Sequence, residues 1–224
     1  MKKITQEELN NKIELHKEWL EDDNKGEKLE LNGYNLRNLD LSNSDLRYSS
    51  LSCSILSNVD LSYSNLSFST LKDADLVKMD LTKAIISFSN LENIDLNSVN
   101  LKNANLYGAN LDSSYLRCVD FKNAILKNAN LDNAHLENCN LEDVNLSQAN
   151  TRCIEGLEVY SIDNIGTFAG KVTYLPEQDK VFAGCWKGNL EEFLEKGLEM
   201  NKDNEKEKRN IFNAYQFFLG TTID

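Results

Sequence analysis

Few side chains in this sequence have the type and spacing that catalysis requires. The chain has two histidines, His16 and His135, and neither belongs to a metal-binding, nucleotide-binding or nucleophile motif. The most regular titratable groups form a row of aspartates at multiples of twenty residues, comprising Asp40, Asp60, Asp80 and Asp120. A row of this kind does not converge on one point, as catalytic groups must. We therefore expect no enzymatic activity and no cofactor.

The cysteines also lack the spacing of a metal site. They are Cys53, Cys118, Cys139, Cys153 and Cys185. No two of them form a C-x-x-C pair, and an odd number does not suit a disulfide framework. We expect reduced thiols with mainly structural roles and no bound metal.

A five-residue repeat explains why the aspartates are evenly spaced. From Leu31 to Leu146 every fifth residue is apolar, which gives 24 consecutive positions, 22 of them leucine. A period of five would scatter these side chains around an α-helix and would alternate them between the faces of a flat strand. The chain must therefore turn once per repeat, which is typical of a solenoid.

The longer spacings give the size of one coil. Small residues such as Ala84 and Ala104 stand two before the central residue, so we expect one large and one small side chain per repeat to point inward. The outward aspartate row, completed by Asn100 and Asn140, repeats every twenty residues, as does an aromatic row of Tyr48, Phe68 and Phe88. Four repeats thus make one coil, and the 24 positions predict about six coils, stacked at about 4.8 Å.

These repeats resemble those of the pentapeptide-repeat proteins. The family motif is a small residue, Asp or Asn, Leu or Phe, and two variable residues, and it stands here as Ala104-Asn105-Leu106-Tyr107-Gly108 and again from Ala129 to Asn133. The resemblance covers about residues 29–150. It implies an all-β solenoid, in the form of a right-handed quadrilateral β-helix.

Several repeats depart from that motif. The Asp/Asn position is occupied instead by Ile55, Ile85, Tyr115, Ile125 and His135, and the small position by Tyr34, Leu39, Met79 and Ile94. We expect bulges or apolar contacts at these positions. We also expect His135 to lie at the surface and His16 to lie in or near the core.

Residues 1–25 are predicted to form a capping helix on the first coil. Thr5 and Glu8 form a capping box, and the apolar residues that follow have helical spacing. We expect Trp19 and Leu20 to anchor this helix. The solenoid itself is assigned to residues 26–153.

Residues 154–224 are predicted to form a small α+β cap or accessory domain. Short strands are expected over residues 159–167 and 171–186, with a turn at Pro176, the only proline. Helices are expected from Asn189 and over residues 206–219. Because both ends of the solenoid look capped, we expect a monomer rather than an end-to-end dimer.

The charge balance favours a protein partner. The net charge of −12 should repel nucleic acid and the cytoplasmic membrane surface, so direct binding to nucleic acid is not expected. The chain has no apolar stretch long enough to span a membrane and no secretory signal at its start, so we expect a cytoplasmic protein without a membrane segment.

Two outward rows are candidate interaction surfaces. The aromatic row, which we expect Tyr63 and Tyr107 to flank, is typical of a protein interface, although the rings could instead stabilise the ladder or lie beneath a terminal segment. The aspartate row is most simply explained by hydrogen bonds to turn amides. The alternative, which the family resemblance implies, is mimicry of DNA by a regulator of DNA gyrase, another topoisomerase or a further DNA-processing enzyme. Residues 31–150 carry 9 basic and 14 acidic residues, a net charge of only −5, which favours a scaffold or binding protein.

Overall fold

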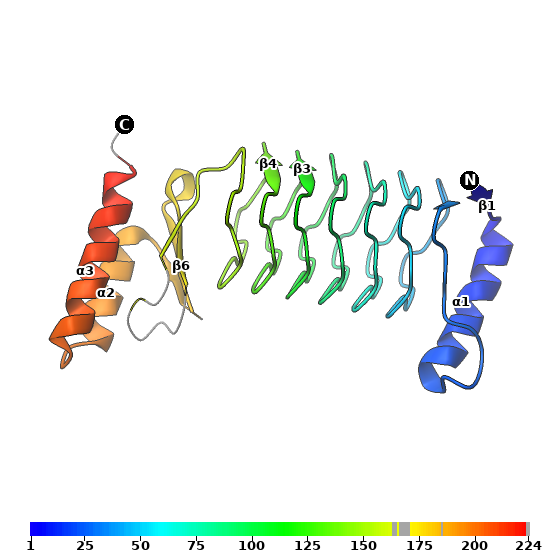
Figure 1. Ribbon diagram of the computed structural model, residues 1–224, viewed down its shortest axis with the longest axis horizontal. Helices are drawn as coiled ribbons and strands as arrows, with labels where there is room; N and C mark the ends of the chain where they lie inside the picture. The colour runs from blue at the N-terminus through cyan, green and yellow to red at the C-terminus, as the bar shows by residue number, and fades with distance from the viewer. Residues whose placement is uncertain (163–164, 166–170, 185, 223–224) are drawn as a thin grey trace.

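In a computed structural model, the chain forms a stack of coils between an N-terminal helix and a C-terminal α+β unit (Figure 1). The structure describes residues 1–162, 165, 171–184 and 186–222. In chain order the elements are β1 (Lys2–Lys3), α1 (Gln6–Glu21), β2 (Tyr34–Asn35), β3 (Tyr115–Arg117), β4 (His135–Glu137), β5 (Tyr160–Ile162), β6 (Val172–Leu175), η2 (Pro176–Gln178), β7 (Lys180–Ala183), β8 (Trp186–Gly188), α2 (Leu190–Met200) and α3 (Glu205–Gly220).

The coils of the solenoid are twenty residues long, as the sequence predicts. Parallel β-bridges join residues twenty apart, beginning with Glu30 and Ser50 and ending with His135 and Glu155. The amide of a central residue donates to a carbonyl of the next coil, and many of these bonds are between 2.6 and 2.9 Å long. Each of the four faces therefore carries a ladder of backbone hydrogen bonds along the solenoid axis.

The row of central residues lies inside the solenoid. All 24 side chains from Leu31 to Leu146 are at most 3% exposed. Most of the small residues two positions earlier are buried as well, with Ala84 and Ala104 fully covered and only Ser44 and Cys139 partly exposed. Both predicted inward rows are thus confirmed, and a continuous apolar core runs the length of the stack.

The repeats that depart from the motif stay within this architecture. Met79 and Ile94, which replace small residues, are buried in the core, so the predicted apolar contacts form there. Tyr115 and His135 begin β3 and β4, which pair in parallel as three-residue strands where other coils make a single bridge.

Helix α1 packs across the first coil. The predicted capping box forms, because the Thr5 side chain accepts from the amide of Glu8 and the Glu8 carboxylate accepts from the amide of Thr5. Leu9 and Ile13 are buried and belong to the same apolar cluster as the solenoid core.

The residues that anchor α1 differ from the prediction. Trp19 and Leu20 are only partly buried, whereas His16 is fully buried beside Ile13. The buried stripe follows the helical spacing of Leu9, Ile13 and His16, and it ends before the last turn. Trp19 lies to one side of this stripe and stacks on the ring of His16.

The C-terminal unit combines an antiparallel sheet with two helices. The sheet has the order β5-β6-β7-β8, and α2 packs against α3. The predicted turn at Pro176 is present as η2, and the helix predicted from Asn189 is α2, which begins with a capping box. The helix predicted over 206–219 is α3. Parts of the predicted strands, together with Cys185, lie outside the described residues.

The hairpin of β6 and β7 also covers the last coil. Leu175 and Phe182 belong to the solenoid core cluster, whereas Phe193 and Phe218 belong to a second cluster within the C-terminal unit. In the described part of the chain, no helix has the length and apolar character that a membrane crossing needs.

Candidate interaction surface

The aromatic row is a stack of parallel rings. The ring centroids of Tyr48 and Phe68 are 5.2 Å apart, as are those of Phe68 and Phe88, and the planes differ by only 8° and 9°. The three side chains are 45%, 50% and 51% exposed. Because each ring covers the face of its neighbour, the row presents ring edges to solvent. It is therefore poorly suited to stacking on a sugar or a nucleic-acid base, both of which need an open ring face.

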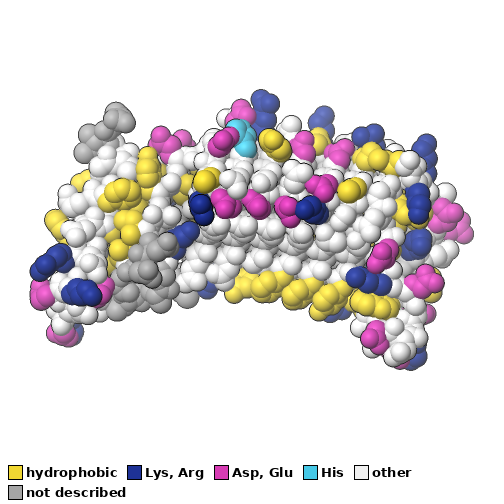
Figure 2. Space-filling view, in the orientation of Figure 1, with side chains coloured by type: hydrophobic (Ala, Val, Ile, Leu, Met, Phe, Trp, Pro, Cys, Tyr) yellow, Lys and Arg dark blue, Asp and Glu magenta, His cyan; other side chains and the backbone are white. Residues whose placement is uncertain are grey.

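The aromatic row continues beyond its three members at both ends. On the N-terminal side Trp19 packs edge-on against Tyr48, with ring centroids 6.5 Å apart. On the C-terminal side Tyr107 packs edge-on against Phe88 at 5.2 Å. The result is a run of hydrophobic side chains along the lower edge of the molecule, visible in Figure 2. Sequence periodicity could not reveal the contribution of Trp19, because α1 lies outside the repeat.

A glycine ends the stack of parallel rings. Gly108 stands twenty residues after Phe88, at the position where a fourth ring would lie. Its φ is +65°, and a Cβ there would lie 2.8 Å from the ring of Phe88. Phe88 thus packs over bare backbone, which fixes the end of the row.

Tyr63 does not flank the aromatic row, contrary to the prediction. It is fifteen residues from Tyr48, so its side chain lies on the adjacent face. There the Lys83 ammonium lies 5.0 Å from the centre of the Tyr63 ring. Tyr107 does contact the row, so only one of the two expected flanking residues is in place.

The face that carries the aromatic row has little charge. This aromatic face consists of the outward positions of the repeats centred on Leu46, Leu66 and every twentieth residue thereafter. From residue 45 to residue 148 its only charged side chains are Asp45, Arg47 and Lys127. Arg47 binds Asp45 through its Nε and one terminal nitrogen, with a shortest distance of 2.7 Å. The exposed aromatic surface is therefore bordered by an internal ion pair rather than by a field of one sign.

The aspartate row lies on the adjacent face and serves the turns. Each carboxylate accepts a hydrogen bond from the backbone amide two residues later, at 2.8 Å for Asp40, Asp60 and Asp80 and 3.1 Å for Asp120. The hydrogen bonds from the Ser42 hydroxyl and amide hold the pKa of Asp40 below its usual range. These contacts have the geometry expected of turn-stabilising carboxylates.

Lysines pair with acidic groups on the C-terminal half of the same face. Lys102 lies 2.9 Å from Asp120, and Lys122 lies 2.8 Å from Glu142. Only the N-terminal part of the aspartate row, at Asp40, Asp60 and Asp80, therefore presents carboxylates without a basic partner among the described residues.

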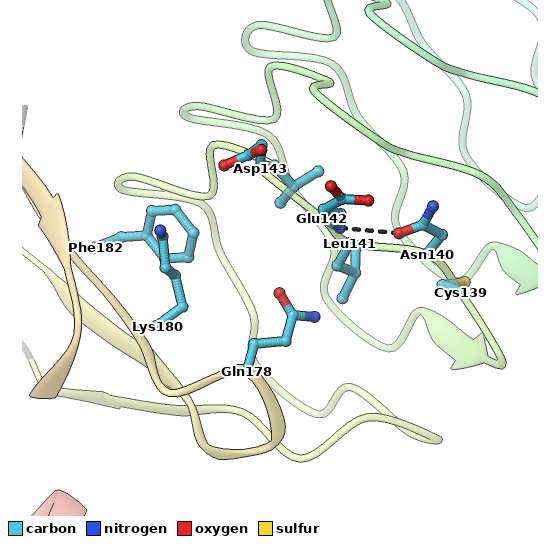
Figure 3. Close-up of a pocket in the computed structure, with 9 residues that line it drawn as sticks. Cys139, Asn140, Leu141, Glu142, Asp143, Gln178, Lys180 and Phe182 are labelled. Atoms are coloured by element: carbon cyan, nitrogen blue, oxygen red, sulfur yellow. Dashed lines mark hydrogen bonds between the residues drawn. The ribbon is translucent and has the colours of Figure 1, made fainter.

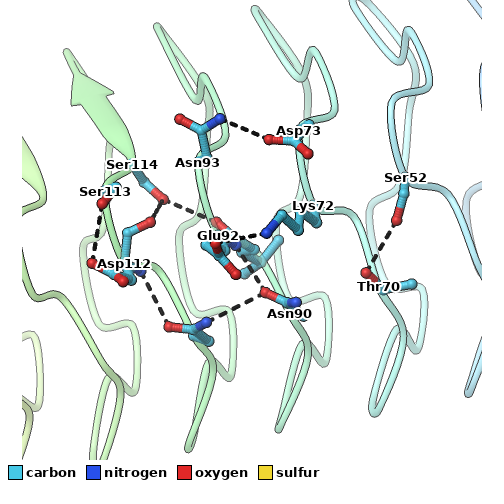
Figure 4. Close-up of polar contacts among 12 residues, drawn as sticks. Ser52, Thr70, Lys72, Asp73, Asn90, Glu92, Asn93, Asp112, Ser113 and Ser114 are labelled. Carbon is cyan, nitrogen blue, oxygen red and sulfur yellow. Dashed lines mark hydrogen bonds and ion pairs between the residues drawn. The ribbon is translucent and has the colours of Figure 1, made fainter.

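A third face is occupied by polar contacts between coils (Figure 4). Lys72 binds Glu92 at 2.7 Å, and the Asn93 amide donates to Asp73 at 2.7 Å. A ladder of side-chain amides runs along this face through Asn90, Asn110, Asn130 and Asn150. These polar groups bond to one another and are therefore less available to a partner. The aromatic face, by contrast, exposes apolar surface that a partner could bury.

The two histidines, which could in principle take part in catalysis, make structural contacts instead. His16 is buried, its Nδ1 accepts from the Leu29 amide at 3.1 Å, and its Nε2 lies 3.0 Å from the carbonyl of Arg47. Burial lowers the pKa of His16 below its ordinary value of 6.5, which favours the neutral ring. His135 is partly exposed beside Glu137 and Glu155, as expected of a surface residue.

The four cysteines that the structure describes show no arrangement suited to catalysis. Burial raises the pKa of the Cys139 thiol to about 11, and its Sγ donates to the carbonyl of Leu116. Cys53, Cys118 and Cys153 are exposed free thiols. Among the residues that the structure describes, no group of histidine, cysteine and acidic side chains could hold a metal ion.

Comparison with known proteins connects this geometry to one family. The family model described as pentapeptide repeats matches in 8 copies, over residues 30–62, 60–97, 81–117, 94–133 and 114–150. No curated protein matches the chain. The matched family consists of structural repeats and does not indicate an enzyme.

Solved structures of similar proteins come from several sources. HetL, a pentapeptide repeat protein involved in heterocyst differentiation regulation from the cyanobacterium Nostoc sp. strain PCC 7120, is 22% identical, with 57% of this chain and 68% of that chain covered and a TM-score of 0.36. Rfr23 from the cyanobacterium Cyanothece 51142 is 26% identical, with 66% and 97% covered and a TM-score of 0.32. QnrB1, a plasmid-mediated fluoroquinolone resistance protein, is 18% identical, with 56% and 64% covered and a TM-score of 0.30.

Proposed function

Because this chain belongs to the pentapeptide-repeat family, whose members fold as right-handed quadrilateral β-helices, we propose that it is a non-enzymatic binding protein that presents its aromatic row to a protein partner. The observation that carries this proposal is the uninterrupted stack of exposed rings from Tyr48 to Phe88 on a face with little charge. Clustered aromatic side chains are typical of the residues that dominate binding energy at protein interfaces.

Backbone conformation supports a role for these rings beyond stability. Tyr48, Phe68 and Phe88 have φ of 63°, 61° and 58°, in the left-handed region. Asn occupies this position in many other repeats, since it tolerates that conformation better than a bulky residue does. The left-handed conformation costs about 1–2 kcal/mol for an L-residue, and ring stacking returns only about 0.5–1.5 kcal/mol. Folding stability alone therefore gives little reason for aromatic residues here.

The exposed ring edges indicate the chemistry of the partner surface. The edge of an aromatic ring carries partial positive charge and its hydrogens are apolar. Aliphatic side chains, aromatic faces and carbonyl oxygens are complementary to such edges. A partner surface rich in these groups would bury the row without leaving a charge unpaired.

The proposed binding unit is a monomer made of three parts. Residues 1–25 would cap the first coil, residues 26–153 would form the binding solenoid, and residues 154–224 would cap the last coil or act as an accessory domain. The packing of Leu9 at one end and of Phe182 at the other supports this division, because each joins the solenoid core. Covered ends disfavour end-to-end association.

A second candidate function is regulation of DNA gyrase, another topoisomerase or a further DNA-processing enzyme through mimicry of DNA. The exposed carboxylates of Asp40, Asp60 and Asp80, one coil apart, favour it. Against it, the lysines paired with Asp120 and Glu142 neutralise the far end of this row. Duplex DNA as long as the solenoid, about 29 Å, would carry about 17 charges, far more than this face does.

A pair of double variants separates the two functions. We would identify a partner by pull-down with the intact chain from its native lysate, and then measure the affinity of Phe68→Asn with Phe88→Asn. Asparagine suits the left-handed backbone, so the fold should persist while binding weakens by at least about thirtyfold, the loss of roughly 2 kcal/mol. The matched control is Asp60→Asn with Asp80→Asn, which keeps the turn hydrogen bonds and should leave binding unchanged.

Each alternative result has a defined meaning. If the aspartate variants weaken binding to a DNA-processing enzyme and the aromatic variants do not, mimicry replaces the proposal. Added salt should then weaken that binding further. If neither pair matters and removal of residues 154–224 abolishes binding, the solenoid is a support for the C-terminal unit.

A further inference from the structure

On the aspartate face, the backbone ladder stops at residues 141–143 of the last coil. One coil earlier, the amide of Phe121 donates to Asn140 and the amide of Asn123 donates to Glu142, both at 2.9 Å. The equivalent amides of the last coil belong to Leu141 and Asp143. Neither amide has a hydrogen-bond partner among the described residues. Two parallel donors, two residues apart, therefore mark the end of this face.

The opposite end of the same face is closed by a side chain. The primary amide of Gln6 accepts from the Asp40 amide at 2.8 Å and donates to the Asp40 carbonyl at 2.9 Å. An amide group from α1 thus takes the place of a neighbouring coil. This contact shows that the edge of the aspartate face pairs with amide groups when one is within reach.

A cleft lies directly beside the unpaired amides. It has a volume of about 460 Å³ and separates the segment 139–144 from the hairpin of β6 and β7. Figure 3 shows Gln178, Lys180 and Phe182 on the hairpin side, across from Leu141 and its neighbours. The cleft thus combines the polar side chains of Gln178 and Lys180 with backbone donors, above the buried side chains of Leu141 and Phe182.

Among the described residues, the charges around the cleft leave Lys180 without a partner. Glu142 binds Lys122 at 2.8 Å, and Asp143 lies 3.9 Å from Lys187. Within the described part of the chain, Lys180 makes no side-chain hydrogen bond or ion pair. An acidic group that enters the cleft would find an ammonium group ready to pair.

We propose that this cleft binds an extended segment of a partner polypeptide that carries an acidic side chain, and that the segment adds a parallel strand to the last coil. The register follows from the preceding coil, where Asn140 donates to the carbonyl of Val119 and accepts from Phe121. The bound residue opposite Asn140 would donate to the carbonyl of Cys139 and accept from the amide of Leu141. The residue two positions later would accept from the amide of Asp143, as in strand addition at other exposed sheet edges.

This site is separate from the aromatic row and does not depend on its function. The aromatic row would recognise side-chain surface, whereas the cleft would recognise main-chain amides. The two sites could therefore bind two parts of one partner or two different partners, and each can be tested with the other intact.

A peptide that copies the protein's own repeats provides the probe. We would titrate the full-length chain with an acetylated and amidated decapeptide of residues 104–113, which contains Asp112, and follow backbone amides by nuclear magnetic resonance and hydrogen exchange. In the free protein the amides of Leu141 and Asp143 should exchange fast, and those of Phe121 and Asn123 slowly. Addition of the peptide should shift and protect the first pair alone.

Two substitutions locate the binding site. Gln178→Trp should fill the cleft and weaken peptide binding at least about tenfold, whereas Glu177→Trp, at an exposed neighbouring position that does not line the cleft, should not. Lys180→Gln should weaken binding about two- to fivefold, the range of an exposed ion pair. It should have no effect on a decapeptide with asparagine in place of its aspartate.

Three results would overturn the proposal. The first is slow exchange of the Leu141 and Asp143 amides in the free protein, because the edge would then already be paired. The second is the absence of shifts at these amides when the decapeptide is in large excess. The third is peptide binding that Gln178→Trp leaves unchanged, which would place the peptide elsewhere.

Discussion

At its N-terminal end the solenoid is closed by polar contacts as well as apolar ones, whereas at its C-terminal end the closure is mainly apolar. Strand β1 pairs with β2, the Gln6 side chain pairs with Asp40, and His16 bonds the backbone of Leu29 and Arg47. At the other end Leu175 and Phe182 cover the core, but the amides beside the cleft stay unpaired within the described residues.

This difference separates two requirements that a solenoid end must meet. The hydrophobic effect requires that the last layer of leucines be covered, and this need is non-directional. The backbone groups require partners in fixed directions, and this need is local. A hairpin can satisfy the first requirement without the second, so an end can be stable and still able to bind a strand.

The largest expected effect comes from a substitution in the solenoid core, on which both ends pack. Leu96→Asp would place a carboxylate without a partner in the core of the middle coils, where Leu96 is 1% exposed. We expect the free energy of unfolding to fall by more than about 4 kcal/mol and much of the solenoid to unfold, as measured by urea denaturation. Ser98→Asp, at an exposed position of the same repeat, is the control. An unchanged midpoint for Leu96→Asp would contradict the inward assignment of this row.

Removal of the apolar cover should affect one end only. Phe182→Ala removes a fully buried ring that covers the last coil, and we expect the free energy of unfolding to fall by about 3–5 kcal/mol. Hydrogen exchange should accelerate near Leu126 and in the C-terminal unit while Leu46 stays protected. Phe212→Ala, at an exposed position of α3, should change neither. Equal acceleration at both ends would show that the two closures act as one cooperative unit.

Acid should weaken the N-terminal closure through His16. Burial keeps the pKa of the folded His16 ring below 6.5, so the unfolded chain takes up a proton first as the pH falls. The stability from this group is complete above about pH 6.5 and is lost as the pH drops through 6.5 towards the folded pKa. Urea midpoints should therefore fall between about pH 7.5 and pH 5 more steeply for the natural protein than for His16→Gln. Parallel curves would remove His16 from the acid response.

The smallest expected effect concerns the amide that closes the aspartate face. Gln6→Ala removes both hydrogen bonds to Asp40 and should lower the free energy of unfolding by about 1 kcal/mol. The Asp40 amide should then exchange faster, while Asn11→Ala, at an exposed position of the same helix, leaves it unchanged. If the Asp40 amide stays protected in Gln6→Ala, the side chain is not what closes this edge.

The contacts that repeat could be predicted from sequence, and the contacts that occur once could not. Leu96 and Phe68 each belong to a series, so their inward and outward positions follow from spacing alone. His16 and Trp19 belong to a helix that occurs once, and its hydrophobic stripe identifies a buried face without identifying what that face meets. The interpretation of Trp19 as an anchor was incomplete for this reason, because His16 is the more deeply buried residue and Trp19 contacts the solenoid through the aromatic row. The cleft beside Leu141 depends on how a non-repeating hairpin packs, for which the repeat carries no information.

Because one coil is twenty residues long, the position of a surface residue within the coil decides on which face it lies, and insertions or deletions can change that face. A duplication of one whole coil between Tyr48 and Phe68 would lengthen the aromatic row and leave every face in register. An insertion of a single pentapeptide there would keep the core intact yet rotate Phe68 and all later residues onto the neighbouring face. The core tolerates insertions in steps of five, whereas the surfaces tolerate them only in steps of twenty. Small duplications can thus change which residues share a face of this protein during evolution without disrupting its core.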